Sequence, residues 1–164
     1  MDIKPHGIHH VTAIASDPQK NVDFYTKTLG LRMVKQTVNF DAPHIWHLYY
    51  GDEQGSPSSI LTFFPWPGVA RGREGAGLTT ATSFSVPRES IGFWQQRAKS
   101  LGIEVEGLQM RFDSEVLTFL DPDGMRIELV GTDSDVRSGW DGEASIPQEH
   151  AIRGLHAVTL SERE

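Results

Sequence analysis

The sequence contains no cysteine, which excludes disulfide bridges and metal sites built on thiolates. It also has no apolar run near the roughly 20 residues that a membrane-spanning helix requires. The first residues, MDIKPHG, lack the apolar segment that a secretory signal carries. These absences favour a cytoplasmic protein that does not have a membrane as a partner.

Basic residues are outnumbered by acidic ones, 15 to 22, which gives a formal net charge of -7. Phosphate backbones and anionic lipid surfaces repel such a chain, so we do not expect nucleic acid as a partner. The length of 164 residues and the hydrophobic fraction of 38% are typical of a soluble globular protein. Either one ordinary domain or two small repeated modules would fit this length.

Three segments of the chain begin alike, with GIHHVT at 7–12, GLTTAT at 77–82 and GLHAVT at 154–159. After the first two, the similarity continues through an aromatic pair and a later Leu-Gly. Self-similarity of this kind indicates a repeated structural unit. We therefore predict module one over 1–66, module two over 67–131, a connector over 132–153 and the first strand of a truncated third module over 154–164.

Each of the first two modules has the pattern of a strand, a helix and three further strands. In module one, Asp17 and Pro18 predict the start of the helix and Gly30 predicts its end. Hydrophobic runs and turn residues predict the remaining elements. The expected strands lie at 7–15, 31–38, 45–50, 58–64, 78–86, 103–108, 115–120 and 125–130, and the second helix at 88–101.

Two adjacent histidines, His9 and His10, stand inside the first predicted strand. Alternation along a strand would send their side chains to opposite faces. Imidazole nitrogens inside a β-sheet are costly unless each finds a partner. Either both histidines are satisfied structural residues, or at least one of them is a ligand.

The βαβββ repeat with a histidine in its first strand resembles the glyoxalase/bleomycin-resistance/extradiol dioxygenase superfamily. The motifs GIHHVT, HLYYG at 47–51, TFFP at 62–65, GREGAG at 72–77 and EHAIRG at 149–154 resemble most closely those of ring-cleaving dioxygenases that act on hydroquinones. The resemblance implies an α+β fold of two βαβββ modules, with curved mixed sheets and outer helices. Members of that family continue through further modules, so we expect this chain to be an N-terminal half plus the start of module three.

The resemblance also implies a cofactor and partners. Such enzymes use non-haem Fe(II), in some members Mn(II), held by two histidines and one carboxylate with positions left open. The expected partners are a small aromatic substrate and dioxygen, and exposed sheet edges favour a homodimer. By the same resemblance, His10 is a metal ligand, while His9 and Thr12 act on the substrate. His9 could shuttle a proton, because imidazole titrates near neutral pH.

Glu128 is the second expected metal ligand, because the superfamily commonly places a carboxylate in the last strand of a module. Ile127 and Leu129 point away from it, so Glu128 faces either solvent or a cavity. The full-length ring-cleaving family takes its glutamate from the last module, which makes a structural role the alternative. Thr80 and Ala157 occupy the places equivalent to His10, and neither is a credible ligand for iron.

Three functions therefore stay open at the level of sequence. The first is a ring-cleaving dioxygenase for hydroquinone- or catechol-like aromatics, to which this chain contributes His10 and part of the pocket. The second is a metal-dependent lyase or isomerase of the glyoxalase type, against which Thr80 counts. The third is a metal-free dimeric binding module. His47, in the HLYYG motif, is expected either to pack in the sheet or to line the cavity.

Overall fold

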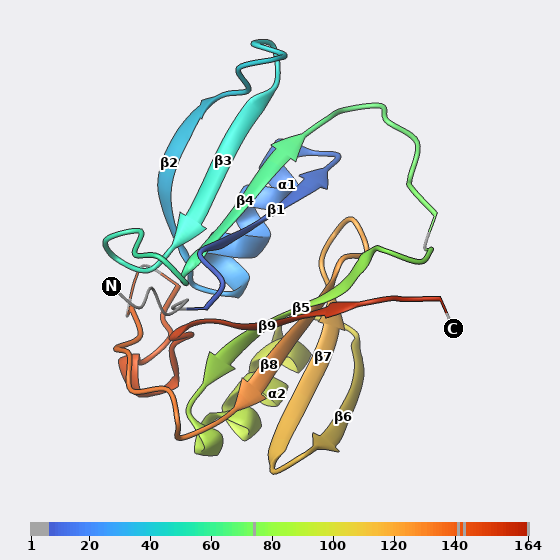
Figure 1. The fold of residues 1–164 in the computed structure, drawn as a ribbon. Coiled ribbons are helices and arrows are strands. Elements are labelled where there is room, and N and C mark those ends of the chain that lie inside the picture. The colour runs from blue at the N-terminus through green and yellow to red at the C-terminus, as the bar shows by residue number, and fades with distance from the viewer. Residues whose placement is uncertain (1–6, 74, 141, 143, 164) are drawn as a thin grey trace, which may run out of the picture.

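The computed structural model describes residues 7–73, 75–140, 142 and 144–163. Two β-sheets, each accompanied by a helix, follow one another along the chain (Figure 1). This arrangement confirms the predicted α+β fold of two βαβββ modules. The outer limits of the predicted modules, at residues 1–6 and 164, lie outside the described residues. No helix in the described part of the chain is long and apolar enough to cross a membrane.

In the first sheet the strand order is β1-β4-β3-β2, with β1 parallel to β4 and the other pairs antiparallel. The helix begins where predicted, because the Asp17 side chain accepts the backbone N–H groups of Gln19 and Lys20. Gly30, with φ 71°, follows its end, as expected of a helix stop. The first unit comprises β1 (His10–Ala15), α1 (Pro18–Asp23), a π-helical turn (Phe24–Thr28), β2 (Arg32–Val38), β3 (Trp46–Gly51) and β4 (Ile60–Pro65).

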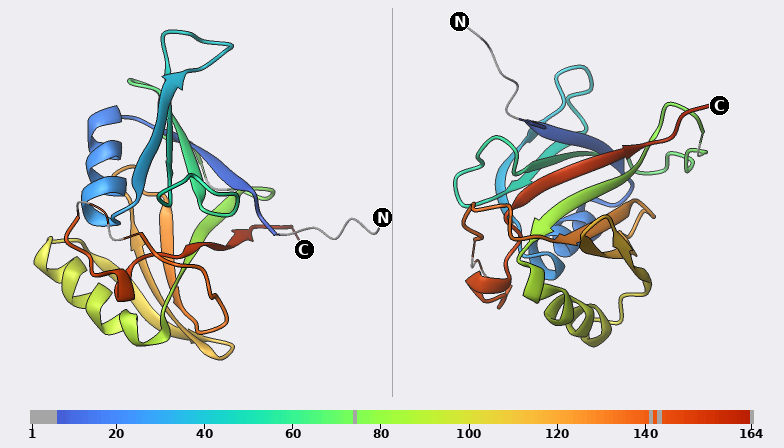
Figure 2. Two further views of the ribbon diagram at one scale, coloured as in Figure 1. Left: turned by 90° about the vertical axis from the view of Figure 1, so that its left-hand side faces the viewer. Right: turned by 60° about the horizontal axis from the view of Figure 1, so that its bottom comes forward.

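The second sheet repeats this order and adds one strand, as β6-β7-β8-β5-β9. The predicted helix over 88–101 is a 3₁₀ turn followed by α2, and both helices lie on the same side of the two sheets (Figure 2). The second unit comprises β5 (Thr79–Val86), the 3₁₀ turn (Arg88–Ser90), α2 (Ile91–Ser100), β6 (Val105–Arg111), β7 (Ser114–Leu120) and β8 (Arg126–Gly131). A further 3₁₀ turn (Gln148–His150) and β9 (Gly154–Leu160) follow.

The added strand β9 is the segment expected to open a third module. It pairs antiparallel with β5, the first strand of the second unit, with Val158 opposite Thr82. The corresponding edge of the first sheet is β1, which pairs only with β4 among the described residues. The two sheets thus differ at their first strands, because β5 is covered by β9 while one edge of β1 is free.

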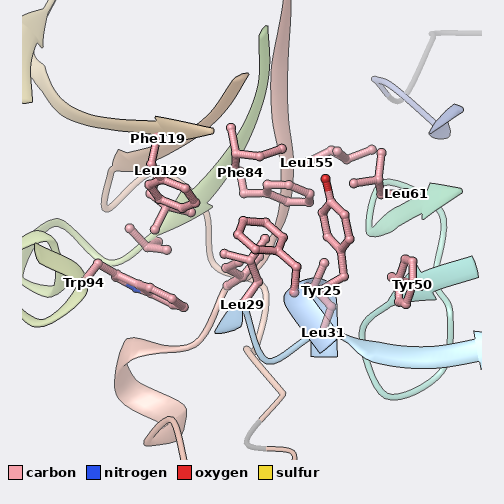
Figure 3. Packing of buried hydrophobic residues seen from close by; sticks show 14 of the residues in the cluster. Tyr25, Leu29, Leu31, Tyr50, Leu61, Phe84, Trp94, Phe119, Leu129 and Leu155 are labelled. Atoms are coloured by element: carbon pink, nitrogen blue, oxygen red, sulfur yellow. The ribbon is translucent and has the colours of Figure 1, made fainter. Parts of the chain in front are cut away.

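The hydrophobic core joins the first helical segment to both sheets (Figure 3). The Tyr25 ring lies 4.7 Å from that of Phe63 and 5.2 Å from that of Tyr50, centroid to centroid. The neighbouring Phe24 reaches Phe119 of the second sheet at 6.3 Å. Tyr25 also donates a hydrogen bond of 2.9 Å to Asp121, so the two units share one interior.

Arg137, in the connector, holds three parts of the chain together. Its guanidinium donates to the carbonyl oxygens of Ser58 before β4 and Leu155 in β9, at 2.9 and 3.0 Å. It also pairs with Asp135 at 2.6 Å. Burial raises the pKa of Asp135, but hydrogen bonds from Arg137 and Ser85 outweigh it and hold the pKa at about 2.

Replacing Arg137 by methionine should destabilise the chain by about 2 kcal/mol, because Asp135 and two carbonyls lose their shared donor. The measurement is urea unfolding at pH 7. Arg88→Met is the matched control, since its pair with Asp133 is exposed on both sides, at 49% and 66% of side-chain area. Equal losses in the two variants would contradict a special role for Arg137.

Candidate functional site

The two histidines of the GIHHVT motif lie next to each other at the start of β1. His10 is the first residue of the strand, three residues later than predicted, and His9 precedes it. Because His9 lies outside the strand, the alternation of side chains between the two faces does not apply to it. Its Nδ1 lies 3.1 Å from Nδ1 of His10. Both side chains are exposed. The contact occupies one nitrogen of each ring and leaves each Nε2 available to an outside partner.

The face of the first sheet turned away from α1 carries His10, and we call it the helix-free face. Thr12 lies on it two residues along β1 and shares a hydrogen bond of 2.9 Å with Thr62 of β4. Tyr49 of β3 is opposite Thr62, and Lys35 of β2 is opposite Tyr49. A row of polar side chains thus crosses all four strands, from β1 at one edge of the sheet to β2 at the other.

His47 lies beside this row, packed between two rings of the same face. Its centroid is 4.1 Å from that of Tyr49 and 4.1 Å from that of Phe64. Its Nδ1 is 2.9 Å from the Tyr49 hydroxyl. Burial lowers the pKa of His47, and the positive charges of Lys35 and His10 lower it further. His47 therefore packs in the sheet, which is one of the two roles expected for it, while the lining of a cavity by His47 stays a prediction.

Glu128 lies in the other sheet, where its carboxylate is already paired. Arg111 donates to both oxygens, at 2.6 and 2.8 Å, and Ser83 donates to Oε2 at 2.6 Å. The residue is only 3% exposed. Arg111 lowers the pKa of Glu128, and this effect outweighs the burial that would raise it. Metal binding by Glu128 stays a prediction, and it would require these three bonds to be given up.

Glu128 does face a cavity, which is one of the two positions expected for it. The cavity, of about 510 Å³, also contains Thr80, Arg111 and Arg126 in its lining. Thr80 is the residue of the second unit that corresponds to His10, so the cavity has no imidazole at this position. Within the described part of the chain, no three His, Asp or Glu side chains gather as a group that could hold a metal. Of the expected ligands, His10 is the exposed one.

The sequence predicted neither the partner of Glu128 nor the contact between Tyr49 and His47. Arg111 is 17 residues away from Glu128 along the chain and meets it across β6, β7 and β8. No local pattern indicates that contact. Tyr49, in contrast, stands two residues from His47 in a strand, and this spacing alone places both on one face.

Comparison with known proteins identifies relatives over nearly the whole chain. A family model described as the Glyoxalase/Bleomycin resistance protein/Dioxygenase superfamily matches residues 7–129. MhqO of Bacillus subtilis, provisionally named a ring-cleaving dioxygenase, is 42% identical over 161 residues, which are 98% of this chain and 51% of MhqO. The chlorohydroquinone/hydroquinone 1,2-dioxygenase of Sphingobium indicum is 36% identical over 159 residues, 94% of this chain and 49% of that enzyme.

The chain therefore spans about half the length of the curated relatives it matches. A crystal structure from Bacillus subtilis, provisionally named a dioxygenase, superimposes with a TM-score of 0.89 at 42% identity. The match covers 94% of this chain and 49% of that one. The two-sheet arrangement found here is thus similar to one half of a larger solved protein.

Proposed function

The chain belongs to the Glyoxalase/Bleomycin resistance protein/Dioxygenase superfamily, and from that membership we propose that it is the N-terminal part of a ring-cleaving dioxygenase. Its substrates would be hydroquinone- or catechol-like aromatics together with dioxygen. The observation that carries the proposal is the 36% identity to a chlorohydroquinone/hydroquinone dioxygenase over 94% of this chain. The dioxygenase names of other relatives agree with it.

The metal of this enzyme would be Fe(II), or Mn(II), with His10 as one of its ligands. His10 suits this role because it is exposed and its Nδ1 faces His9, which leaves Nε2 for a metal. When bound, the metal supplies adjacent sites for the aromatic substrate and for dioxygen. The described residues offer one such ligand, so the remaining ligands would come from another part of the protein or from a second copy.

The free edge of β1 is where the missing partner would dock. In the second sheet, β9 already lies antiparallel on β5, the strand equivalent to β1. A further βαβββ module that paired with β1 in the same way would bring its own residues to the helix-free face beside His10. The unpaired backbone groups of β1 favour such an addition. Module two and the module that begins with β9 would then form one pair, and module one would pair with a further module.

His9 and Thr12 would act on the substrate and not on the metal. His9 can accept or return a proton of a ring hydroxyl through its Nε2, because its contact with His10 occupies only Nδ1. Thr12 projects from the same face as His10 and would fix the substrate by a hydrogen bond, while Thr62 holds its hydroxyl in place. Both roles are proposals that rest on this shared face.

A second candidate follows from the same free edge. Two copies of this chain could pair through β1 and form a metal-free binding site, as expected of a dimeric binding module. A metal-dependent lyase or isomerase has less support, because Thr80 replaces a ligand in the second unit. A monomer at all concentrations, by sedimentation, would count against the dimeric module.

Oxygen uptake tests the proposed activity. The protein read from the gene at full length, reconstituted with Fe(II), should consume dioxygen with hydroquinone and place both oxygen atoms in a ring-opened product. The 164-residue chain should show no such turnover, because it presents His10 without the other ligands. Catalase in the assay separates this activity from hydroquinone autoxidation, which releases peroxide. Full-length protein that binds iron but leaves hydroquinone intact would contradict the proposal.

A further inference from the structure

Ser58 lies in the loop between β3 and β4 and has an unusual backbone conformation. Its φ is 70°, a left-handed value that few residues other than glycine adopt. A residue keeps such a conformation only where the surrounding contacts fix it, and residues of this kind are common at functional sites. The contacts of Ser58 therefore indicate what it does in the molecule.

Both backbone groups of Ser58 form hydrogen bonds, and they reach different parts of the chain. Its N–H donates to the carbonyl oxygen of His9 at 2.8 Å. Its own carbonyl oxygen accepts from the backbone N–H of Leu155 at 2.7 Å and from the Arg137 guanidinium at 2.9 Å. Ser58 thus joins the start of β1 to the connector and to β9 (Figure 1). We call this set of hydrogen bonds the Ser58 bridge.

The loop that carries Ser58 is held in shape by its own hydrogen bonds. The Asp52 carboxylate accepts from the backbone N–H groups of Gln54 and Ser56, at 3.1 and 2.9 Å. The Ser59 hydroxyl donates to the carbonyl oxygen of Ser56 at 2.8 Å. Because the loop is fixed on both sides of Ser56, we expect it to move as a unit. A displacement of Ser58 would therefore be passed on to its partners.

Gly154, the first residue of β9, leaves the space that the Ser58 bridge requires. A Cβ atom at position 154 would lie 2.7 Å from the Ser58 carbonyl oxygen and would overlap the Arg137 guanidinium. Gly77, the glycine that opens the second copy of the repeat, has no atom within 4 Å of such a Cβ. Both glycines have a positive φ, 149° and 83°. Only Gly154 of these two is therefore required by a close contact.

The other end of the Ser58 bridge is the residue beside the proposed metal ligand. His9 comes directly before β1, and its Nδ1 lies 3.1 Å from Nδ1 of His10. Residues that orient a metal-bound imidazole through its other nitrogen typically change metal affinity by about 10–100-fold when they are lost. The backbone position of His9 therefore affects the direction in which His10 presents its Nε2.

We propose that Ser58, held by Arg137 and by β9, positions His9 and through it the metal-binding nitrogen of His10. This inference rests on the proposed function, because it takes His10 as a metal ligand. Ser58 and Arg137 are positioning residues in this assignment, since neither contacts His10 itself. The start of the third copy of the repeat thus sets the geometry of the imidazole pair in the first copy.

Gly154→Ala tests the Ser58 bridge in the full-length protein, with Mn(II) as the probe. The added methyl group would displace the Ser58 carbonyl, so Mn(II) affinity should fall by about 10-fold, the lower end of the range for residues that orient a ligand. The electron paramagnetic resonance signal of free Mn(II) measures binding without turnover. Gly77→Ala is the matched control, because it places alanine at a positive φ in open space and should leave the affinity unchanged. Equal affinities in the two variants would overturn the proposal.

Variants at Arg137 and Ser58 decide the matter if Gly154→Ala folds poorly. Arg137→Met removes one donor to the Ser58 carbonyl and should weaken Mn(II) binding, whereas Arg88→Met, which loses an exposed pair, should not. Ser58→Gly keeps both backbone groups and suits a φ of 70°, so it should retain the wild-type affinity. A loss in Arg88→Met or Ser58→Gly as large as that in Arg137→Met would contradict the proposal.

NMR of the histidine side chains separates this inference from the proposed function, because it needs no metal. The Nδ1 signals of His9 and His10, assigned with the alanine variant of each, should shift in Gly154→Ala and stay in place in Gly77→Ala. Unchanged signals in Gly154→Ala would overturn the positioning role. Shifted signals in a protein that binds no Mn(II) would support the positioning role and overturn His10 as a ligand.

Discussion

Replacing His10 by alanine should remove the transition metal from the full-length protein and with it the oxygen uptake. A direct ligand matters more than the residues that orient it, whose loss typically weakens metal binding by about 10–100-fold. We therefore expect metal affinity to fall by more than about 100-fold. Elemental analysis of the purified protein measures the loss. Activity should fall in proportion to the metal lost.

Two further variants test whether the loss of metal is specific to His10. His9→Ala should lower turnover and weaken metal binding by about 10–100-fold, less than His10→Ala does, because His9 orients the His10 ring through Nδ1 and is not itself a ligand. His44→Ala is the control, since that exposed ring packs near Trp66, at 6.3 Å. Full metal content in His10→Ala would contradict the ligand assignment. Stoichiometric metal on the 164-residue chain would mean that a second copy completes the site.

Replacing Arg111 by methionine should lower the stability of the chain by about 2 kcal/mol at pH 7. Removal of one partner of a buried pair costs about 3–5 kcal/mol, and we reduce that figure because Arg111 is partly in contact with solvent. Arg111 is 37% exposed and Glu128 4% exposed, by side-chain area. The variant would leave a carboxylate buried with Ser83 as its remaining donor. Thermal unfolding should show a shift of about 4–8 °C.

The pH dependence of this loss follows from the direction of the shift. The folded pKa of Glu128 is lowered, so the ion pair stabilises the fold above the unfolded value, near 4.5. That contribution disappears as the pH falls through the lower folded pKa. The difference between wild type and Arg111→Met should therefore be largest at neutral pH and shrink in acid.

The double variant Arg111→Met/Glu128→Gln tests whether the unpaired charge of Glu128 causes the loss of stability. Glutamine carries no charge and can still accept from Ser83, so most of the lost stability should return. Arg126→Met, which loses a more exposed pair with Glu106, should cost less than about 1 kcal/mol. A double variant no more stable than Arg111→Met would assign the loss to packing instead of charge.

Local chemistry in the sequence predicted much of the fold. Asp17 caps α1, because its carboxylate accepts the first free N–H groups of the helix, and this needs only neighbours in the chain. The repeated GIHHVT, GLTTAT and GLHAVT segments marked three equivalent strands, which are β1, β5 and β9. Boundaries were less accurate. β6 runs over Val105–Arg111 where 103–108 was expected, since pairing with β7 decides where a strand begins and ends.

The site depended more on contacts between distant residues. The sequence marked His9, His10 and Thr12 through one motif, but alternation predicted opposite faces for the two histidines. The structure starts β1 at His10 and frees His9 from that rule, so their rings meet. Strand alternation also placed the Glu128 side chain on the face opposite to those of Ile127 and Leu129. Nothing in the sequence, however, indicated that Arg111 pairs with Glu128. That contact exists only once three strands pair in register.

The sequence by itself determined the repeat, the family resemblance and the exclusion of thiolate sites, because each depends on residue identity or on spacing along one strand or helix. Only the tertiary structure decided that β9 joins β5 while β1, within the described part of the chain, keeps a free edge, and that Arg111 pairs with Glu128. Strand partners and buried ion pairs join residues far apart in the chain. Their energies depend on distance and burial, which a linear order of residues does not contain.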